Sequence, residues 1–427
     1  MYFHNMTTSL ERAFYFSSKA KRCLRSAIYF EELFRYPECI SFSQDSIEFS
    51  GKAILEFFDV GYSKEHYMGR ELEEYLGKKN NPVIKKLLYE ISRAVVISDR
   101  WLQQSRNLTK YGFMHIGLSP AKAFRKEEVK LAIDDANEIV NFMNKVEIYK
   151  KFQPPIKIAI LNGFAKSDVG ETLCANTPQR LTINDWINHL SNVRTIDNNQ
   201  KYVITTIKSC EISNEFALII NPFSETYPEF DINRKLIFDI IEDYLFNGGT
   251  FLCLNGFPFF YGWDVSRGQN IPLVEGQIIY PRRIVINNTV FVPNIPAILP
   301  FSGTLFYRRI NGRTTGDTSG PQGHQGPYPV NIFQTRDDIR KFGRFITNRR
   351  NINVEEFRAM THDTQDCIPI LRADRPPFGE VYPIAAKKHG RGYLISCGMR
   401  INRVSDKNKI FKATDRFLDW INRNNNL

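Results

Sequence analysis

The sequence predicts two domains, a helical bundle followed by an α/β domain whose parallel sheet is joined by a C-terminal β-hairpin. Its 427 residues exceed what one hydrophobic core usually organises. Apolar residues recur at helical spacing through the first 150 residues, whereas short, continuously apolar runs begin at residue 156. The change falls at Gln153-Pro154-Pro155. We therefore expect domains at residues 1–150 and 156–427, with a linker at 151–155.

The first domain is predicted to be all-helical. Helical spacing covers residues 8–34, 40–58 and 126–143, and residues 71–76 predict a shorter helix. Another helix is expected from Pro82, a residue type that the first helical turn tolerates, to about Leu102. The periodicity breaks between Asn107 and Pro120, which separates the last two helices.

Three apolar runs predict core strands of the second domain, at residues 156–161, 216–220 and 250–254. Runs of this kind are typical of parallel strands covered on both faces. Helical spacing at 234–244 makes the last two runs a βαβ unit. Further along, the sequence predicts a long loop rich in Gly, Thr and Arg, a hairpin and a closing helix, at residues 308–326, 383–396 and 407–422.

The composition limits the class of protein. A net charge of +11 and a pI of about 9.2 favour acidic partners such as nucleic acid, although the scattered basic residues are equally compatible with a solvated surface. Seven cysteines without a CxxC pair indicate a reducing cytosol. The sequence has neither an apolar signal core nor a run of about 18 apolar residues, so we expect a cytoplasmic protein that does not enter a membrane.

The first domain resembles the HEPN family over nearly its whole length. The resemblance is carried by residues 42–55 with their Gln44, Glu48 and Lys52-Ala53, by His66, by Thr109-Lys-Tyr-Gly112 and by Ser119-Pro120. It implies a bundle of four or five helices that self-associates as a homodimer or a higher oligomer. Active members resemble metal-independent endoribonucleases in which about four to six residues separate an Arg from a His.

The resemblance implies Arg106, Asn107, Lys110 and His115 as catalytic residues. RNA cleavage needs a general base and a general acid, which His can supply, and a cation such as Arg that stabilises phosphate charge. Eight residues separate Arg106 from His115, which departs from the family spacing, and Lys110 lies closer to the His. The alternative is that Arg106 caps its helix and His115 is a loop residue.

The second domain resembles the class I glutamine amidotransferase-like superfamily, which implies a flavodoxin-like parallel-sheet sandwich. Residues 156–163, 217–228 and 246–256 carry this resemblance. Active members place a nucleophilic Cys on the turn where this chain has Asn255-Gly256, and Cys253 lies two residues earlier, inside the predicted strand. We expect no glutaminase activity and interpret Cys253 as a core residue.

Open α/β sheets bind ligands in the crevice at the carboxyl ends of their strands. The alternative is that Asn and Gly there only serve turn geometry. We expect neither a metal nor a cofactor, because the sequence has no P-loop, GxGxxG or metal-ligand cluster. The candidate crevice residues are Asn162, Gly163, Asn221, Ser224, Glu225, Asn255 and Gly256.

Three functions follow as hypotheses. The leading one is a toxin-like effector of antiphage defence or stress response, in which the α/β domain senses a small molecule or a protein and the helical dimer cleaves RNA. The second is a non-catalytic dimerisation or binding protein that acts beside a partner such as a nucleotidyltransferase. The third is an enzyme of unknown reaction in the α/β crevice.

Overall fold

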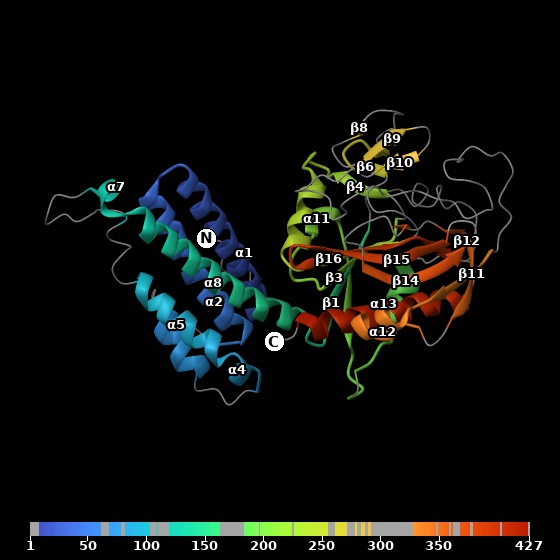
Figure 1. Ribbon diagram of the computed structural model, residues 1–427, viewed down its shortest axis with the longest axis horizontal. Coiled ribbons are helices and arrows are strands. Elements are labelled where there is room, and N and C mark those ends of the chain that lie inside the picture. The colour runs from blue at the N-terminus through green and yellow to red at the C-terminus, as the bar shows by residue number, and fades with distance from the viewer. Residues whose placement is uncertain are drawn as a thin grey trace. The chain divides into compact units, whose positions relative to one another are not determined.

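The chain divides into two compact units, one of Met1–Lys151 together with Asn425–Leu427 and the other of Phe152–Asn424. The computed structural model in Figure 1 describes residues 8–60, 68–77, 82–102, 109, 119–162, 183–195, 197–223, 226–254, 261–270, 278–279, 283–286, 289–291, 328–346, 349–357, 360–361, 368–375, 379–401 and 404–425. None of the described helices combines the length and apolar character of a membrane span.

The helical unit is built on four long helices around one hydrophobic core. These are α1 (Ser9–Glu32), α2 (Tyr36–Phe57), α5 (Leu88–Leu102) and α8 (Lys126–Lys151). Shorter helices are α3 (Met68–Leu72), a π-helix (Glu73–Gly77), α4 (Pro82–Lys86) and α7 (Pro120–Ala123). The predicted all-helical unit is confirmed, with two differences: the helix expected from Pro82 to Leu102 is interrupted at Leu87, and α8 is eight residues longer than predicted.

Local sequence explains how the first two helices begin and pack. Thr8 and Glu11 form a capping box, in which each side chain accepts a hydrogen bond from the other residue's backbone N–H. Helix α2 begins with a Pro in its first turn. The rings of Phe14 and Phe57 meet edge to face, with centroids 5.3 Å apart, and join α1 to α2 in the core.

The α/β unit contains an eleven-stranded mixed sheet in the described residues. Its parallel half has the spatial order β2-β1-β3-β5-β16, which is 2-1-3-4-5 along the chain, an order known from doubly wound sheets. These strands are β1 (Ile156–Leu161), β2 (Tyr202–Ile207), β3 (Leu218–Asn221), β5 (Thr250–Cys253) and β16 (Gly392–Cys397).

The other half of this sheet is antiparallel, so the prediction of a parallel sheet is correct only in part. The predicted hairpin is present, and it continues from β16 into further strands. These strands are β15 (Gly379–His389), β14 (Ile368–Arg375), β11 (Tyr328–Phe333), β12 (Arg350–Phe357) and β17 (Met399–Ile401), with β13 (Met360–Thr361) beside β15. Several carry charged and polar residues, so a search for continuously apolar runs does not find them.

Two small sheets accompany the large one. The first contains β4 (Thr226–Phe230), β6 (Tyr261–Asp264) and β7 (Gln269–Asn270). The second contains β8 (Ile278–Ile279), β9 (Arg283–Ile286) and β10 (Thr289–Phe291).

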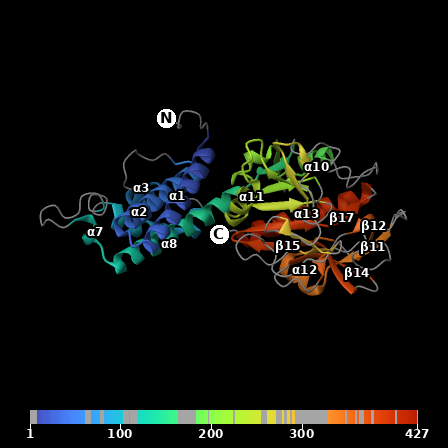
Figure 2. The same ribbon diagram turned by 90° about the horizontal axis from the view of Figure 1, so that it is seen from above.

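Helices cover both faces of the parallel strands. Leu394 of β16 packs in the core that includes α11 (Ile237–Phe246), whereas its neighbour Tyr393 contacts Phe417 of α13 (Val404–Asn425). Successive strand residues point to opposite faces, so α11 and α13 lie on opposite sides of the sheet, as Figure 1 shows. Helix α10 (Ile183–Ser191) lies beside α13, where Trp186 meets Phe411 edge to face at 4.3 Å (Figure 2). Helix α12 (Arg336–Phe342) precedes β12.

The hairpin packs tightly against the end of α11. The backbone N–H of Arg391 donates to the carbonyl of Phe246 at 3.2 Å, and that of Tyr393 donates to the carbonyl of Gly249 at 3.1 Å. A Cβ atom at Gly392 would lie 2.0 Å from the Gly249 carbonyl oxygen. This close approach therefore requires glycine.

Candidate functional site

The four predicted catalytic residues, Arg106, Asn107, Lys110 and His115, lie outside the described residues, as does His66. The flanking structure is described as far as Leu102, the last residue of α5, and, apart from Thr109, resumes at Ser119 before α7. The structure therefore describes the helices that flank the candidate catalytic residues, and the contacts that position these helices.

The last turn of α5 is held from two neighbouring helices. Gln44 of α2 donates from Nε2 to the carbonyl of Trp101 at 2.7 Å. The indole of Trp101 donates from Nε1 to Oδ2 of Asp135 on α8 at 2.7 Å, and Arg100 donates to the same oxygen at 2.8 Å. Asp135 is buried, so these charge-assisted hydrogen bonds are strong. They fix the point from which the chain continues toward Arg106.

The polar residues of α2 that carry the HEPN resemblance are mostly buried. Lys52 pairs with Glu48 one helical turn earlier, with 2.6 Å between Nζ and Oε1. Gln44 anchors Trp101 as described above. The structure thus gives these residues packing and positioning contacts inside the bundle.

A cavity of about 550 Å³ joins the two later motifs of the resemblance to the junction of α1 and α2. Thr109, Ser119 and Pro120 line it together with Phe34 and Glu38. Segments that are distant in the sequence therefore meet at this end of the bundle.

A buried ionic cluster lies toward the other end of α8. Lys21 Nζ is 2.8 Å from Oε2 of Glu147, to which Ser17 also donates, and Lys151 Nζ is 4.0 Å from Oε1. Burial alone raises the pKa of Glu147, but the charges of Lys21 and Lys151 and the hydrogen bonds outweigh it and hold this pKa below its usual value. Burial lowers the pKa of Lys151 to about 8, against the opposing charge of Glu147.

In the α/β unit, Asn162 directly follows β1 and Asn221 is the last residue of β3. These are the neighbouring strands between which the strand order reverses. Asn162 is exposed, and its backbone N–H donates to the carbonyl of Ile207 at 2.8 Å. Asn221 is buried, and its Oδ1 accepts from the Phe223 N–H at 3.1 Å, a turn-forming contact. The other candidates, Gly163, Ser224, Glu225, Asn255 and Gly256, lie outside the described residues, as does the predicted loop at 308–326.

Cys253 is a core residue of β5, as predicted. It packs in the cluster beneath α11, and burial raises the pKa of its thiol, against a hydrogen bond with the Asn221 side chain. A thiol held in this way is not an accessible thiolate nucleophile. Among the described residues, no group of three or more His, Cys, Asp or Glu side chains could hold a metal ion.

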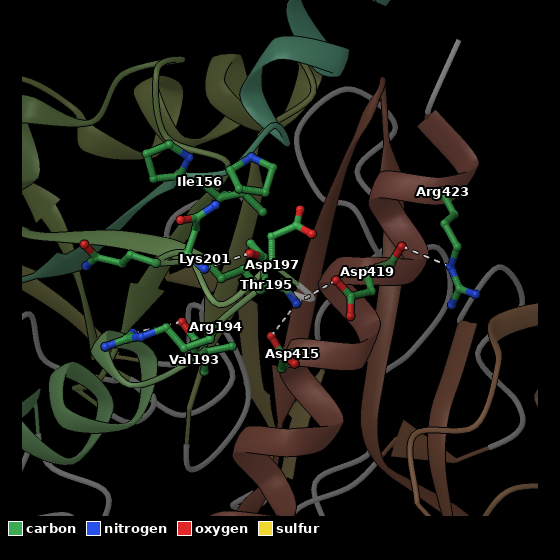
Figure 3. Close-up of a pocket in the computed structure, with 13 residues that line it drawn as sticks. Ile156, Val193, Arg194, Thr195, Asp197, Lys201, Asp415, Asp419 and Arg423 are labelled. Carbon is green, nitrogen blue, oxygen red and sulfur yellow. Dashed lines mark hydrogen bonds and ion pairs between the residues drawn. The ribbon is translucent and has the colours of Figure 1, made fainter.

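A further cavity that the sequence did not indicate lies at the amino ends of β1 and β2 (Figure 3). Its volume is about 980 Å³. Asp415 and Asp419 of α13 point toward Lys201, whose Nζ lies 2.9 Å and 2.7 Å from their carboxylates, and Tyr202 donates to Asp415. These ion pairs and this hydrogen bond connect α13 to the start of β2. More than 200 positions separate the partners, so no local motif could predict them.

The protein therefore belongs to the class in which a helical bundle is followed by an α/β unit. The parallel strands of the α/β unit have the order of a doubly wound sheet. The helical unit carries a HEPN domain, because the family model of the HEPN domain matches residues 14–146. No curated protein matches the chain.

Several solved structures have a weak overall likeness to the chain. A β-galactosidase from Bacillus circulans sp. alkalophilus is 10% identical, with 66% of this chain and 34% of that chain covered and a TM-score of 0.36. A cold-adapted β-galactosidase from Rahnella sp. R3 is 10% identical, with 71% of this chain and 35% of that chain covered and a TM-score of 0.36. A β-galactosidase from Halorubrum lacusprofundi is 11% identical, with 90% of this chain and 59% of that chain covered and a TM-score of 0.29. The chain spans about a third of the first two, and TM-scores this low carry no argument on fold or activity.

Proposed function

We propose that the protein is a HEPN-type ribonuclease effector of antiphage defence or stress response, regulated by its α/β unit. The observation that carries the proposal is the HEPN match, which spans residues 14–146 and so includes all four candidate catalytic residues. The net charge of +11 is consistent with an RNA substrate.

In this proposal, Arg106 and His115 form the reaction site, with Asn107 and Lys110 beside them. His115 removes the proton of the attacking 2′-hydroxyl and returns one to the leaving oxygen, while Arg106 stabilises the phosphate charge. Two protomers contribute their copies to one composite site. The contacts of Trp101 with Gln44 and Asp135 support the site by fixing the end of α5.

RNA cleavage by the purified full-length protein in EDTA tests this site. Arg106→Ala and His115→Ala are expected to lower the cleavage rate by about a hundredfold or more, because each removes a group that acts in the transition state. Lys110→Ala shows whether this residue shares the role of Arg106. Arg70→Ala is the matched control, since Arg70 is exposed and its carboxylate partner Glu74 lies 3.9 Å away.

Unchanged cleavage in both Arg106→Ala and His115→Ala would remove these residues from the mechanism. Loss of cleavage on addition of EDTA would contradict metal-independent chemistry. Equal losses in Arg70→Ala and Arg106→Ala would indicate a general effect of basic charge rather than a reaction site.

The regulatory part of the proposal assigns the α/β unit to ligand sensing without glutaminase activity. The strand order 2-1-3-4-5 supports an amidotransferase-like, flavodoxin-like core with a crevice at the ends of β1 and β3. Buried Cys253 supports the absence of a nucleophile. A small ligand that raises the melting temperature is expected to lose this effect in Asn255→Trp, which fills the crevice. A shift that persists in the variant would place the ligand elsewhere.

A second candidate function is non-catalytic self-association or docking through the helical unit, beside a partner such as a nucleotidyltransferase. It is favoured by three apolar side chains at the end of α1, because Tyr29, Leu33 and Phe34 are 57%, 47% and 74% exposed. Light scattering of the wild type and of Leu33→Ser/Phe34→Ser tests it. A dimer that dissociates in the variant, together with wild-type protein that never cleaves RNA, would favour this function over the first.

A further inference from the structure

An aromatic residue in an unfavourable backbone conformation follows the end of helix α1. The backbone N–H of Arg35 donates to the carbonyl of Phe30, and that of Phe34 donates to the carbonyl of Glu31, both at 2.9 Å. These two bonds define a Schellman motif, in which the residue at the place of Phe34 is left-handed and is usually Gly. Phe34 has a φ of 57°. A bulky side chain is rare in this conformation, because its Cβ crowds the following carbonyl oxygen.

The ring of Phe34 does not compensate for this strain by packing in the core. Its side chain is 74% exposed. The ring meets that of Tyr36 edge to face, with the centroids 6.5 Å apart. A glycine at position 34 would therefore suit the end of the helix better than the phenylalanine does. Strained residues of this kind concentrate at sites that bind ligands.

Phe34 borders the cavity between the junction of α1 and α2 and the start of α7. The volume of this cavity, about 550 Å³, lies within the roughly 300 to 1,000 Å³ that is typical of small-molecule pockets. Its described lining also contains the hydroxyls of Ser41, Thr109 and Ser119 and the carboxylate of Glu38. An exposed aromatic ring beside polar groups suits a nucleobase, which stacks on the ring through its face and forms hydrogen bonds through its edge.

One carboxylate oxygen of Glu38 is open to a ligand. Arg35 donates from Nε to Oε1 of Glu38 at 3.1 Å, and its Nη2 approaches the same oxygen. Oε2 of Glu38 forms no hydrogen bond with the described part of the chain. A carboxylate only accepts hydrogen bonds. Oε2 therefore favours a base with an amino group, such as cytosine, over uracil, which has a carbonyl at that position.

The cavity is close to the proposed reaction site along the chain. Thr109 is three residues from Arg106, and Ser119 is four residues from His115. Three peptide units span at most about 11 Å. One strand of RNA can therefore reach both the cavity and Arg106.

We propose that this cavity binds one unstacked base of single-stranded RNA, beside the bond that the proposed ribonuclease cleaves. The base stacks on Phe34, and its amino group donates to Oε2 of Glu38. The inference rests on the proposed function for the role of this base in cleavage. Binding of the base can be measured without cleavage.

Binding of a fluorescently labelled, 2′-O-methylated cytosine octamer to the full-length protein tests the stacking contact, because such RNA binds without being cleaved. Phe34→Ala is expected to weaken binding by about tenfold, whereas Phe34→Trp, which keeps an aromatic ring, should stay within about threefold of the wild type. Tyr89→Ala is the matched control, since Tyr89 lies in the same unit outside the cavity and is also 74% exposed. Equal losses in the two alanine variants, or unchanged binding in Phe34→Ala, would overturn the proposal.

Phe34→Gly separates binding from folding. Glycine adopts a positive φ without strain. The variant should therefore raise the melting temperature by about 2–4 °C while it weakens binding as Phe34→Ala does. A lower melting temperature would show that the ring stabilises the bundle. The loss of binding would then have a structural cause, and the proposal would fail.

Comparison of cytosine and uracil octamers tests the contact with Glu38. The wild type should bind the cytosine octamer about fivefold more tightly, because only cytosine offers an amino group to Oε2. Glu38→Gln should remove most of this preference, since an amide can also donate to the uracil carbonyl. Glu32→Gln is the control, because Glu32 is exposed and lies outside the described lining. Equal binding of the two octamers by the wild type, or a preference that persists in Glu38→Gln, would overturn this contact.

These measurements separate the base-binding proposal from the two proposed functions. Binding that depends on Phe34, in a protein that never cleaves RNA, would support the base site without the ribonuclease. Cleavage that depends on Arg106 and His115, without any effect of Phe34 on RNA binding, would leave only the ribonuclease. A dimer that dissociates in Phe34→Ala, measured by light scattering, would assign Phe34 to a protein interface and overturn its role in base binding.

Discussion

The hydroxyl of Tyr244 joins three backbone groups inside the α/β unit. It is bonded at 3.0 Å to the carbonyl of Phe216, and at 3.1 Å to both the carbonyl and the N–H of Thr250. Burial raises the pKa of this hydroxyl far above its usual value. The side chain thus fastens the end of α11 to the starts of two strands.

Tyr244→Phe is expected to lower the free energy of unfolding of the α/β unit by about 1–3 kcal/mol, because buried backbone groups are left without a partner. Urea denaturation followed by circular dichroism measures this change. Tyr89→Phe is the control, since Tyr89 is 74% exposed. Equal stability of Tyr244→Phe and the wild type would contradict the assigned role.

The buried lysine at the end of α8 predicts a pH dependence of stability. Lys151 has a pKa of about 8 in the folded protein and 10.5 when unperturbed, so above pH 8 the unfolded chain binds more protons at this residue than the folded chain does. Its contribution to stability therefore rises with pH through this window. The charged groups that act on it are Glu147, whose Oε1 lies 4.0 Å from its Nζ, and Lys21.

Relative to Lys151→Met, the wild type should gain on the order of 2 kcal/mol in free energy of unfolding between about pH 8 and pH 10. Denaturation curves of both proteins at several pH values measure this difference, and shared effects of alkali cancel. A difference that stays constant over the window would show that Lys151 titrates at its usual pKa.

At the scale of elements, the end of α5 depends on one carboxylate of α8. Asp135→Ala removes the acceptor of both Trp101 and Arg100. The last turn of α5 should then exchange its amide hydrogens faster, and RNA cleavage by the proposed site should fall. Hydrogen exchange with mass spectrometry follows residues 96–102. The control is Asp134→Ala, because Asp134 is exposed and adjacent; equal exchange rates in the two variants would contradict the anchoring role.

Sequence patterns predict an element well when one face or both faces are uniformly apolar. Residues 156–161 form the predicted strand β1 at the predicted bounds, and the hairpin around Gly390 is also present. Strand β2 was not predicted, because it is not a continuously apolar run: only its two end residues are buried, and its middle includes two threonines. The break at Leu87 also has no signal in the apolar spacing.

The same limit applies to the candidate sites. Residue types nominate Arg106 and His115, but the contacts that position α5 come from Gln44 and Asp135, which are 91 residues apart. The resemblance singles out Gln44 without showing what it contacts, and nothing in the local sequence distinguishes Asp135. Likewise, Arg416 of α13 donates to the carbonyls of Arg344 and Phe345, more than 70 positions earlier in the chain. Only the arrangement of α13 beside this segment makes these residues neighbours, so local sequence could not predict the contact.

For the whole molecule, the net charge of +11 predicts strongly salt-dependent RNA binding. Affinity for single-stranded RNA should fall by about tenfold or more between about 50 and 200 mM salt, because each phosphate contact releases counterions. Fluorescence anisotropy at several salt concentrations measures the slope. Affinity that does not change with salt would indicate that RNA is held by base stacking rather than by charge.

Strand β16 is the central link between the two halves of the large sheet, since it pairs parallel with β5 and antiparallel with β15. Tyr393 of β16 lies opposite Thr250 of β5, more than 140 positions earlier in the chain. A ribosome therefore releases β5 long before its neighbour exists, and during that time one edge of a very apolar strand has no partner. The helical unit, whose four long helices all lie within the first 151 residues, can fold during this interval. Synthesis of this protein should thus be most vulnerable to aggregation after the helical unit has formed and before β16 emerges.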